Sequence, residues 1–409
     1  MNTDFRKLLI ARFLYTFAVQ MQAVILGWRI YDLLKDPLSL GFIGLVEAIP
    51  AISLALYAGY IVDRSRPLLV YRRVIYVSLL SGILVLSEHL LQSQFTILTQ
   101  ATLLYSASFL TGLARSFAMP VIFASLPRLV PRNELMRASA KMSSAMQIAR
   151  IAGPACGGIA FGFFGVVISS SIVCVLLLCS SVAMLLIKTE ISPPATLHKH
   201  ASIKDELLSG AKFVFSHPIL LPALSLDMIS VLFGGVTALL PIFAKEILFI
   251  GPKGLGALRA APAIGAAAMA FYLSKSNFIK KNSGRWLLSV VAGFGICILI
   301  FGMSHNYILS LSALAFSGAF DSVSMVIRSA AVQFSSPDHM RGKISAVNSI
   351  FIGSSNEIGE FESGIAAKIF GTVPAVYIGG IICLATVGIA AYLSPKLLNL
   401  DLEKLENQA

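Results

Sequence analysis

Long uncharged apolar stretches recur along this chain and restrict its fold more than any other feature. Ranges 98–114, 166–187 and 375–393 contain no Asp, Glu, Lys or Arg. A helix needs about 20 apolar residues to cross a bilayer. Twelve such spans use roughly 240 residues of the chain and leave the rest for loops. The sequence therefore predicts an all-α membrane protein with 12 transmembrane helices. A large globular core with buried helices is the disfavoured alternative.

The charged residues support a membrane protein and set its orientation. Only 13% of the residues are charged, about half of the roughly 25% typical of soluble domains. With the amino terminus inside, the predicted cytoplasmic segments hold 25 of the 32 Lys and Arg residues. This bias follows the positive-inside rule and predicts that both termini are cytoplasmic. The net charge of +12 is thus explained by topology, and no nucleic-acid partner is required.

The longest polar interval, residues 188–218, predicts a connector between two bundles. We expect an N-terminal six-helix bundle over 1–190, a cytoplasmic linker over 191–217 and a C-terminal six-helix bundle over 218–409. Within the linker, apolar residues at helical spacing predict an amphipathic helix. Such a helix suits the membrane surface, and packing on the protein alone explains it equally well.

An internal repeat supports the two halves. Residues 44–52 align with 256–264 at an offset of 212, and residues 131–158 align with 337–364 at an offset of 206. The second and eighth helices, and the fifth and eleventh, are therefore predicted counterparts. Pseudo-symmetric six-helix halves are the arrangement of major facilitator transporters.

The first predicted cytoplasmic hairpin contains an acid among basic residues. Gly59 precedes Asp63-Arg64, and Arg115 lies near the cytoplasmic end of another span. An acid here can face a helix amino terminus or a basic side chain. The hairpin resembles the signature of the major facilitator superfamily, although the glycine that usually follows Asp-Arg is absent. We interpret these four residues as a cytoplasmic gate, and a positive-inside anchor with one incidental acid is the alternative.

The predicted fifth span contains Gly153-Pro154 followed by Gly157-Gly158. Small residues at this spacing allow helices to cross closely, and a proline can bend a helix. The motif is similar to one found in exporters of the same superfamily, and ordinary close packing explains it as well.

Charged residues inside the predicted spans are the candidate functional groups, because each costs about 2.5–3.5 kcal/mol when it faces lipid. They are Glu47, Arg150, Asp227, Arg259, Asp321, Glu357, Glu360 and Glu362. The three glutamates lie within six residues of one span, so they must pair, line water or stay protonated. Proton coupling and structural ion pairing are equally compatible with this pattern. Glu47 and Arg259 occupy equivalent repeat positions, which is compatible with an outer gate pair.

Several longer motifs resemble the bacterial enterobactin-exporter branch of the major facilitator superfamily. They are the runs 27–33 and 36–41, 239–248, 254–262, 321–328 and 348–364. The resemblance covers roughly residues 5–395. It implies a bacterial inner-membrane protein that exports an amphipathic small molecule, such as a siderophore or drug-like metabolite, by alternating access. Protons would be the coupling ions, and the lipid bilayer the surrounding partner. An outer-membrane or periplasmic export partner is also compatible with it.

The resemblance assigns roles to individual residues. The expected substrate-binding side chains are Gln20, Gln22, Asp227, Asp321 and Asn356. The expected proton-coupling side chains are Glu357 and Glu360, with Arg150 as a pairing residue.

Other functions are less well supported by the sequence. Uptake by symport or facilitated diffusion stays open, because the sequence does not determine the direction of transport. A membrane enzyme or sensor should show a nucleophile or metal-ligand cluster or an appended soluble domain, and we expect none of these here. No G-x-x-x-x-G-K-[ST] phosphate loop supports ATP-driven pumping. His198 and His200 could contact a metal, but two histidines on a linker are weak evidence for a metal site. Neither a metal nor a cofactor is therefore expected.

Overall fold

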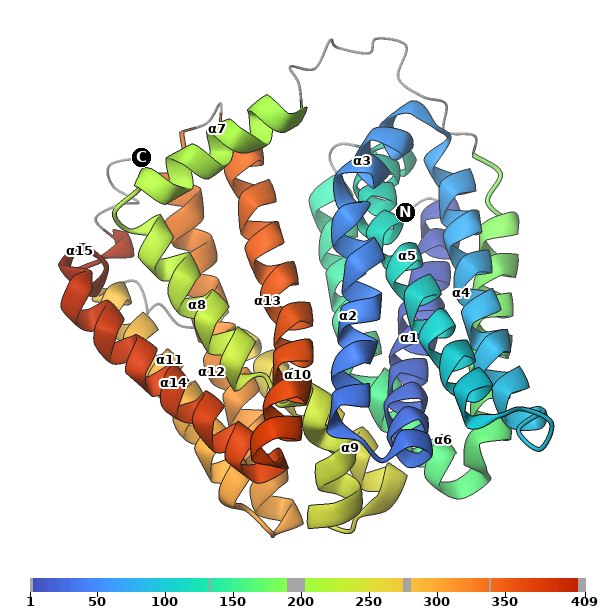
Figure 1. Ribbon diagram of the computed structural model, residues 1–409. Coiled ribbons are helices and arrows are strands. Elements are labelled where there is room, and N and C mark those ends of the chain that lie inside the picture. The colour runs from blue at the N-terminus through green and yellow to red at the C-terminus, as the bar shows by residue number, and fades with distance from the viewer. Residues whose placement is uncertain (1–2, 132–133, 190–202, 275–280, 338–339, 404–409) are drawn as a thin grey trace. The chain divides into compact units, whose positions relative to one another are not determined.

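The fold is built from helices in the part of the chain that the structure describes (Figure 1). This computed structural model describes the chain except residues 1–2, 132–133, 190–202, 275–280, 338–339 and 404–409. The long elements are α1 (Thr3–Leu34), α2 (Pro37–Ser53), α3 (Ala55–Arg64), α4 (Pro67–Leu90), α5 (Ile97–Leu129), α6 (Leu135–Leu185), α7 (Ile203–Ser216), α8 (Leu220–Gly234), α10 (Gly251–Leu273), α11 (Ser283–Met303), α12 (Tyr307–Ser335), α13 (Arg341–Phe370) and α14 (Thr372–Leu393). Short elements are η2 (Thr237–Leu239), α9 (Leu240–Ile242), the π-helix η3 (Phe243–Ile247) and α15 (Pro395–Leu398).

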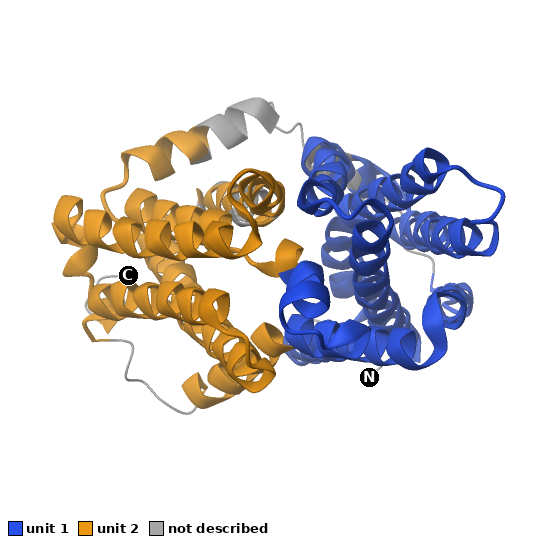
Figure 2. Cartoon of the chain, turned by 60° about the horizontal axis from the view of Figure 1, so that its bottom comes forward, with its two compact units in different colours: residues 1–198, 240–260 blue, residues 199–239, 261–409 orange. Residues whose placement is uncertain are grey.

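The helices form two units (Figure 2). Unit 1 consists of Met1–His198 with Leu240–Ala260, and unit 2 of Lys199–Leu239 with Ala261–Ala409. The segment Leu240–Ala260 lies within the predicted C-terminal bundle but packs with unit 1. The predicted boundaries at 190 and 217 stay a prediction.

Nine helices in the described residues are long and apolar enough to cross a membrane. One of them, α6, has 51 residues and would be about 75 Å long if straight, far more than one bilayer needs. Its helical dihedrals are interrupted at Gly165, where φ is 74°. Glycine adopts a positive φ without a steric penalty, so Gly165 divides this long element into two helices. The count of twelve spans stays a prediction, and the all-α membrane fold is confirmed.

Polar caps define where several helices begin. Asp36 Oδ1 accepts the Leu38 N–H at 3.1 Å at the start of α2. Asn306 Oδ1 accepts the Ile308 and Leu309 N–H groups at the start of α12. These side chains satisfy amides that have no partner within their own helix. The loops before α2 and α12 thereby fix the first turn of each helix.

The glycine motif on α6 lies at close helix crossings within unit 1. A methyl group on Gly157 would lie 2.9 Å from Met21 Cα on α1. One on Gly158 would lie 2.5 Å from Gly256 Cα on α10. Both positions leave no room for a side chain, so small residues let these backbones approach each other.

The predicted linker helix is present as α7. Val214 is fully buried and packs with Leu220, Ile344 and Val347 of unit 2. The side chains of residues 203–208 lie outside the described part of the structure. The carboxyl-terminal part of α7 therefore packs on the protein.

Candidate functional site

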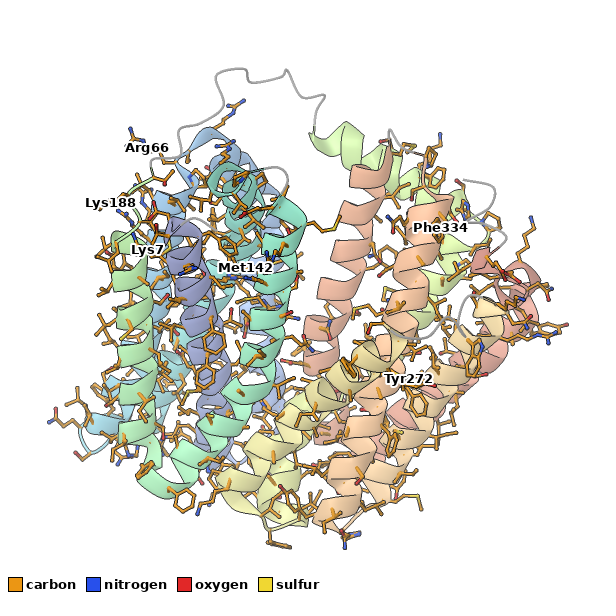
Figure 3. All side chains as sticks on the ribbon, turned by 180° about the vertical axis from the view of Figure 1, so that it is seen from behind. Lys7, Arg66, Met142, Lys188, Tyr272 and Phe334 are labelled. Carbon is orange, nitrogen blue, oxygen red and sulfur yellow. The ribbon has the colours of Figure 1, made fainter. Side chains whose placement is uncertain are left out.

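A cavity of about 490 Å³ lies within unit 1 between α1, α5 and α6. Arg12 and Thr16 come from α1, Met119 from α5, and Met142 and Arg150 from α6. Met142 is labelled in Figure 3 and marks the α6 wall. The cavity volume lies within the range of about 300–1,000 Å³ that is typical of pockets for drug-sized ligands.

Arg12 is buried and its contacts are all with neutral groups. Its Nη1 donates to the Tyr71 hydroxyl at 3.4 Å, and its Nη2 donates to Met119 Sδ at 3.5 Å. The guanidinium also lies 5.5 Å from the Tyr15 ring centroid and 5.8 Å from that of Tyr71. These contacts orient the guanidinium by cation–π attraction, and no carboxylate of the described residues pairs with its charge.

Arg150 adds a second positive charge to the wall of the same cavity. Its side chain is exposed, and it forms no ion pair or hydrogen bond with any residue that the structure describes. Arg115, by contrast, is paired: its Nη1 lies 2.6 Å from Glu47 Oε1. The cavity is therefore cationic as well as apolar.

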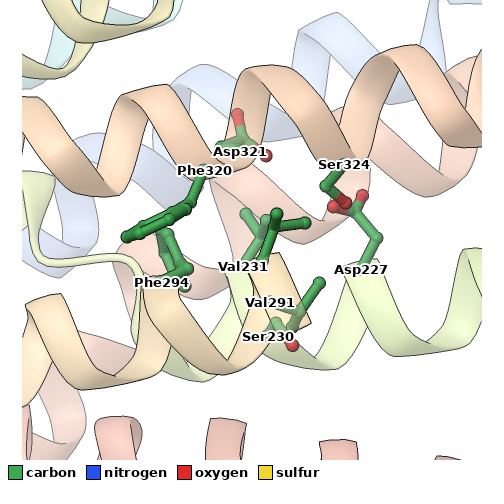
Figure 4. A pocket seen from close by; sticks show the side chains of 9 residues that line it. Asp227, Ser230, Val231, Val291, Phe294, Phe320, Asp321 and Ser324 are labelled. Atoms are coloured by element: carbon green, nitrogen blue, oxygen red, sulfur yellow. The ribbon is translucent and has the colours of Figure 1, made fainter. Parts of the chain in front are cut away.

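Unit 2 contains a separate charged cluster, which we call the α8–α12 triad: Asp227, Asp321 and Arg328 (Figure 4 shows the two carboxylates). Arg328 Nη1 lies 2.5 Å from Asp227 Oδ2, and its Nη2 lies 3.9 Å from Asp321 Oδ1. Arg328 Nε also donates to Ser324 Oγ at 3.2 Å. Asp227 and Arg328 are both buried.

The triad has one more carboxylate than it has cations. Asp227 holds the short ion pair, so the surplus negative charge falls on Asp321. Asp227, Asp321 and Ser324 line a small cavity of about 10 Å³, which is close to the minimum that holds one water molecule. A proton delivered to Asp321 would make the charges of the triad balance.

The predicted substrate-binding residues are distributed over both units. Gln22 is buried, and its Nε2 donates to Ser81 Oγ at 2.6 Å between α1 and α4. Gln20 lies against Gly153 of α6, where a methyl group on the glycine would approach Gln20 Cβ to 2.7 Å. Asn356 is exposed on α13. Asp227 and Asp321 belong to the triad, and all five roles stay predictions.

The predicted coupling residues of the eleventh span lie on α13. Glu360 is partly buried there, and the side chain of Glu357 lies outside the described residues. Arg150 lies on α6 in unit 1 without a carboxylate partner in the described part. The coupling roles of all three residues stay predictions.

The predicted gates have mixed surroundings. Gly59 lies on α3, the side chain of Asp63 is outside the described residues, and Arg64 is exposed. Glu47 on α2 pairs with Arg115 on α5, a residue predicted for the other gate. Arg259 lies against Gly27 of α1: a methyl group added to this glycine would be 3.2 Å from Arg259 Nη2. Both gates stay predictions.

Two motifs of the family resemblance meet at the carboxyl-terminal end of α1. Tyr31 Oη donates to Glu246 Oε1 at 2.6 Å, and Asp32 forms an ion pair with Lys245. Lys245 Nζ also lies 5.9 Å from the ring centroid of Trp28. We call this group the α1–η3 clasp. It binds Leu240–Ala260 to α1 within unit 1.

No group of three or more metal-ligating side chains occurs in the described residues. His198 and His200 lie outside them.

Sequence reasoning missed the roles of two arginines. Arg12 is not among the charged residues predicted inside the spans, although apolar residues 8–11 and Phe13 flank it. Arg328 is not among those charged residues either, yet it is buried in the triad. The available signal was the spacing of Ser324 and Arg328, three and seven residues after Asp321, about one and two helical turns, which places all three near one face of α12.

Comparison with known proteins places this geometry in a family. The sequence profile of the Major Facilitator Superfamily matches residues 8–360. The Enterobactin exporter EntS of Escherichia coli O1:K1 / APEC and that of Shigella boydii serotype 18 are each 26% identical to the chain over 243 residues. Each alignment covers 58% of this chain and 56% of the exporter, so the chain matches about half the length of these curated relatives.

Solved structures show the same fold. A POT family transporter in complex with thioalcohol conjugated peptide has a TM-score of 0.73 at 13% identity, over 96% of both chains. A bacterial homologue of iron transporter ferroportin in the inward-facing state has a TM-score of 0.72 at 16% identity, over 98% of this chain and 100% of that one. These structures support the fold alone, and the profile match adds the family. The chain therefore belongs to the Major Facilitator Superfamily of membrane transporters.

Proposed function

We propose that this transporter exports an amphipathic small molecule in exchange for protons, by alternating access across a bacterial inner membrane. Cargo similar to that of the Enterobactin exporters is supported by the 26% identity to them. The orientation with both termini in the cytoplasm is supported by the distribution of Lys and Arg.

The observation that supports proton coupling best is the surplus carboxylate of the α8–α12 triad. Arg328 compensates Asp227 at 2.5 Å, whereas Asp321 is 3.9 Å away. Inside a membrane protein, an ionised carboxylate that shares its cation with a second carboxylate is incompletely compensated and carries a cost, which the 45% exposure of the Asp321 side chain reduces. A proton on Asp321 removes that cost and leaves a neutral triad. Asp321 can thus exist in two charge states, as a coupling residue must.

Exchange of the proton has a consequence for the ion pairs of unit 2. With Asp321 ionised, two carboxylates compete for Arg328. With Asp321 protonated, Arg328 and Asp227 form a balanced pair between α8 and α12. Loading and release of one proton would therefore change the charge that these two helices share. Glu357 and Glu360 on α13 are the second candidates for this role.

The experiment uses inverted membrane vesicles, whose outer surface is the cytoplasmic face. The lumen is acidified with ATP through the vesicles' own proton pump, and uptake of enterobactin is measured. Export by proton exchange predicts uptake that stops when nigericin collapses the pH gradient. Asp321→Asn should abolish this gradient dependence, because the amide cannot exchange a proton.

The matched control is Asp36→Asn, the same chemical change at the N-cap of α2. Asparagine caps helices as well as aspartate does, so gradient-driven uptake should persist. Uptake that is unchanged by nigericin, or equal in Asp321→Asn and the wild type, would contradict proton coupling through the triad. Gradient-driven uptake in right-side-out vesicles alone would contradict export.

A further inference from the structure

The unit 1 cavity combines two positive charges with a mainly apolar wall, and no carboxylate lines it among the residues that the structure describes. The cations are Arg12 and Arg150. Neither forms an ion pair with a residue that the structure describes. The cavity therefore has an excess of positive charge that the described residues do not neutralise.

The positive charge of Arg12 is energetically costly because this side chain is buried. The residue is only 7% exposed, and a buried charge is normally paired because its desolvation is otherwise uncompensated. Its contacts with Tyr71 and Met119 are long and neutral. The tyrosine rings orient the guanidinium without cancelling its charge. An anion in the cavity would supply the missing partner.

Arg150 contrasts with Arg115 of the same unit. Arg115 has the Glu47 carboxylate at 2.6 Å, whereas Arg150 faces the cavity without an acid. A guanidinium presents several N–H donors in one plane and binds carboxylate, phosphate and sulfonate groups through paired hydrogen bonds. Arg150 is thus available to a ligand.

The remaining wall is mostly apolar and adaptable, and its polar residues are Thr16, Ser139, Ser143 and Gln147. Met119, Met142 and Met146 line it together with Phe123. Methionine side chains are flexible and polarisable, and they adapt to ligands of different shape. A volume of about 490 Å³ accepts a drug-sized body.

We propose that this cavity binds an amphipathic organic anion, whose acidic group contacts Arg12 and Arg150 and whose apolar body packs on the methionines. The ligand class comprises carboxylates, phenolates, phosphates and sulfonates attached to an aromatic or aliphatic body. The statement that this anion is the exported cargo rests on the proposed function, and the binding site itself does not.

The test is equilibrium binding to the purified full chain in phosphatidylcholine nanodiscs, with no pH gradient. Two probes share most of their aromatic frame: 8-anilinonaphthalene-1-sulfonate carries a negative charge, and N-phenyl-1-naphthylamine does not. The binding of each probe to empty nanodiscs is subtracted. We expect Arg150→Gln to weaken binding of the sulfonate about tenfold and to leave binding of the amine within twofold.

Arg137→Gln is the matched control, because Arg137 is an exposed arginine on the same helix that does not line the cavity. It should leave both affinities unchanged. Arg12→Lys keeps the buried charge and should retain sulfonate binding better than Arg12→Gln. If Arg12→Gln fails to fold, the comparison of Arg150→Gln with Arg137→Gln still tests the proposal. The proposal would be overturned if Arg150→Gln and Arg137→Gln changed sulfonate binding equally, or if Arg150→Gln weakened binding of both probes equally.

An anionic lipid headgroup presents the same chemistry, so a second arm separates the two sources. Binding of the sulfonate is repeated in nanodiscs that contain phosphatidylglycerol. Sulfonate binding that keeps its dependence on Arg150 supports a soluble ligand. Loss of that binding with phosphatidylglycerol would overturn the proposal and assign the site to a lipid. Because no gradient is present, a failure of proton coupling leaves these results unaffected.

Discussion

The Arg328 guanidinium on α12 lies 2.5 Å from the Asp227 carboxylate on α8, and both side chains are buried. This pair joins two helices of unit 2 and belongs to the triad with Asp321. Its partners lie 101 positions apart in the sequence, so only the folded chain brings them together.

The first prediction concerns the removal of one partner of this pair. Asp227→Asn leaves Arg328 with only the distant Asp321, and breaking a buried pair in this way costs about 3–5 kcal/mol. We expect a lower midpoint of thermal unfolding in detergent. Asp227→Asn with Arg328→Gln removes both charges and should be less destabilising than the sum of the single changes. A double variant as unstable as that sum would contradict direct pairing.

The second prediction concerns the α1–η3 clasp. Tyr31 Oη donates to Glu246 Oε1 at 2.6 Å, with Tyr31 buried and Glu246 exposed. Tyr31→Phe removes the donor, and Glu246→Ala removes the acceptor. A double-mutant cycle on thermal stability should give a coupling energy of about 1 kcal/mol, the usual net value of one hydrogen bond. A coupling energy of zero would show that the contact adds nothing to the stability of unit 1.

The third prediction concerns the crossing of α6 and α1. Gly157→Val places carbon atoms where Met21 Cα already lies within 2.9 Å of the first of them. Such overpacking costs about 1–3 kcal/mol, so the unfolding midpoint should fall. Gly388→Ala on α14 is the control, because nothing lies within 4 Å of the added methyl group. Alanine favours a helix over glycine by about 1 kcal/mol, so this control should be neutral or stabilising.

The sequence was sufficient for the parts of the fold that depend on local composition. Apolar length predicted membrane helices, and the small residues Gly157 and Gly158 predicted a close crossing that the structure contains. The residues of the α1–η3 clasp lie in the motifs 27–33 and 239–248. The sequence does not predict that they contact each other, because Tyr31 and Glu246 lie 215 residues apart.

The candidate sites were harder to predict, because the role of a charge inside a membrane depends on its partners. Asp227 is predicted to bind substrate, and that role stays a prediction; its ion pair with Arg328 is visible only in the structure. Arg12 is not among the residues predicted to be functional, although it lines a cavity. Residue type identified which side chains are costly to bury. The three-dimensional contacts decided which of them are compensated.

The last prediction concerns the pH dependence of stability at His217, in the loop between α7 and α8. Its Nδ1 accepts the N–H groups of Ile219 and Leu220 at 3.3 and 3.2 Å. Burial, and then the positive charge of Lys396, lowers the pKa of His217 below its ordinary value of 6.5. The unfolded chain therefore takes up the proton at a higher pH than the folded chain does. Stability from this residue is complete above about pH 6.5 and is lost as the pH falls below that value.

Thermal unfolding between pH 8 and pH 5 checks this expectation in detergent. Protonated Nδ1 cannot accept the two amides, so the wild type should lose stability on acidification. His217→Asn keeps an acceptor that does not titrate and should show a weaker loss. His305→Asn, on an exposed loop, should keep the pH profile of the wild type. Identical profiles for the wild type and His217→Asn would mean that the capping of α8 by His217 does not contribute to acid sensitivity.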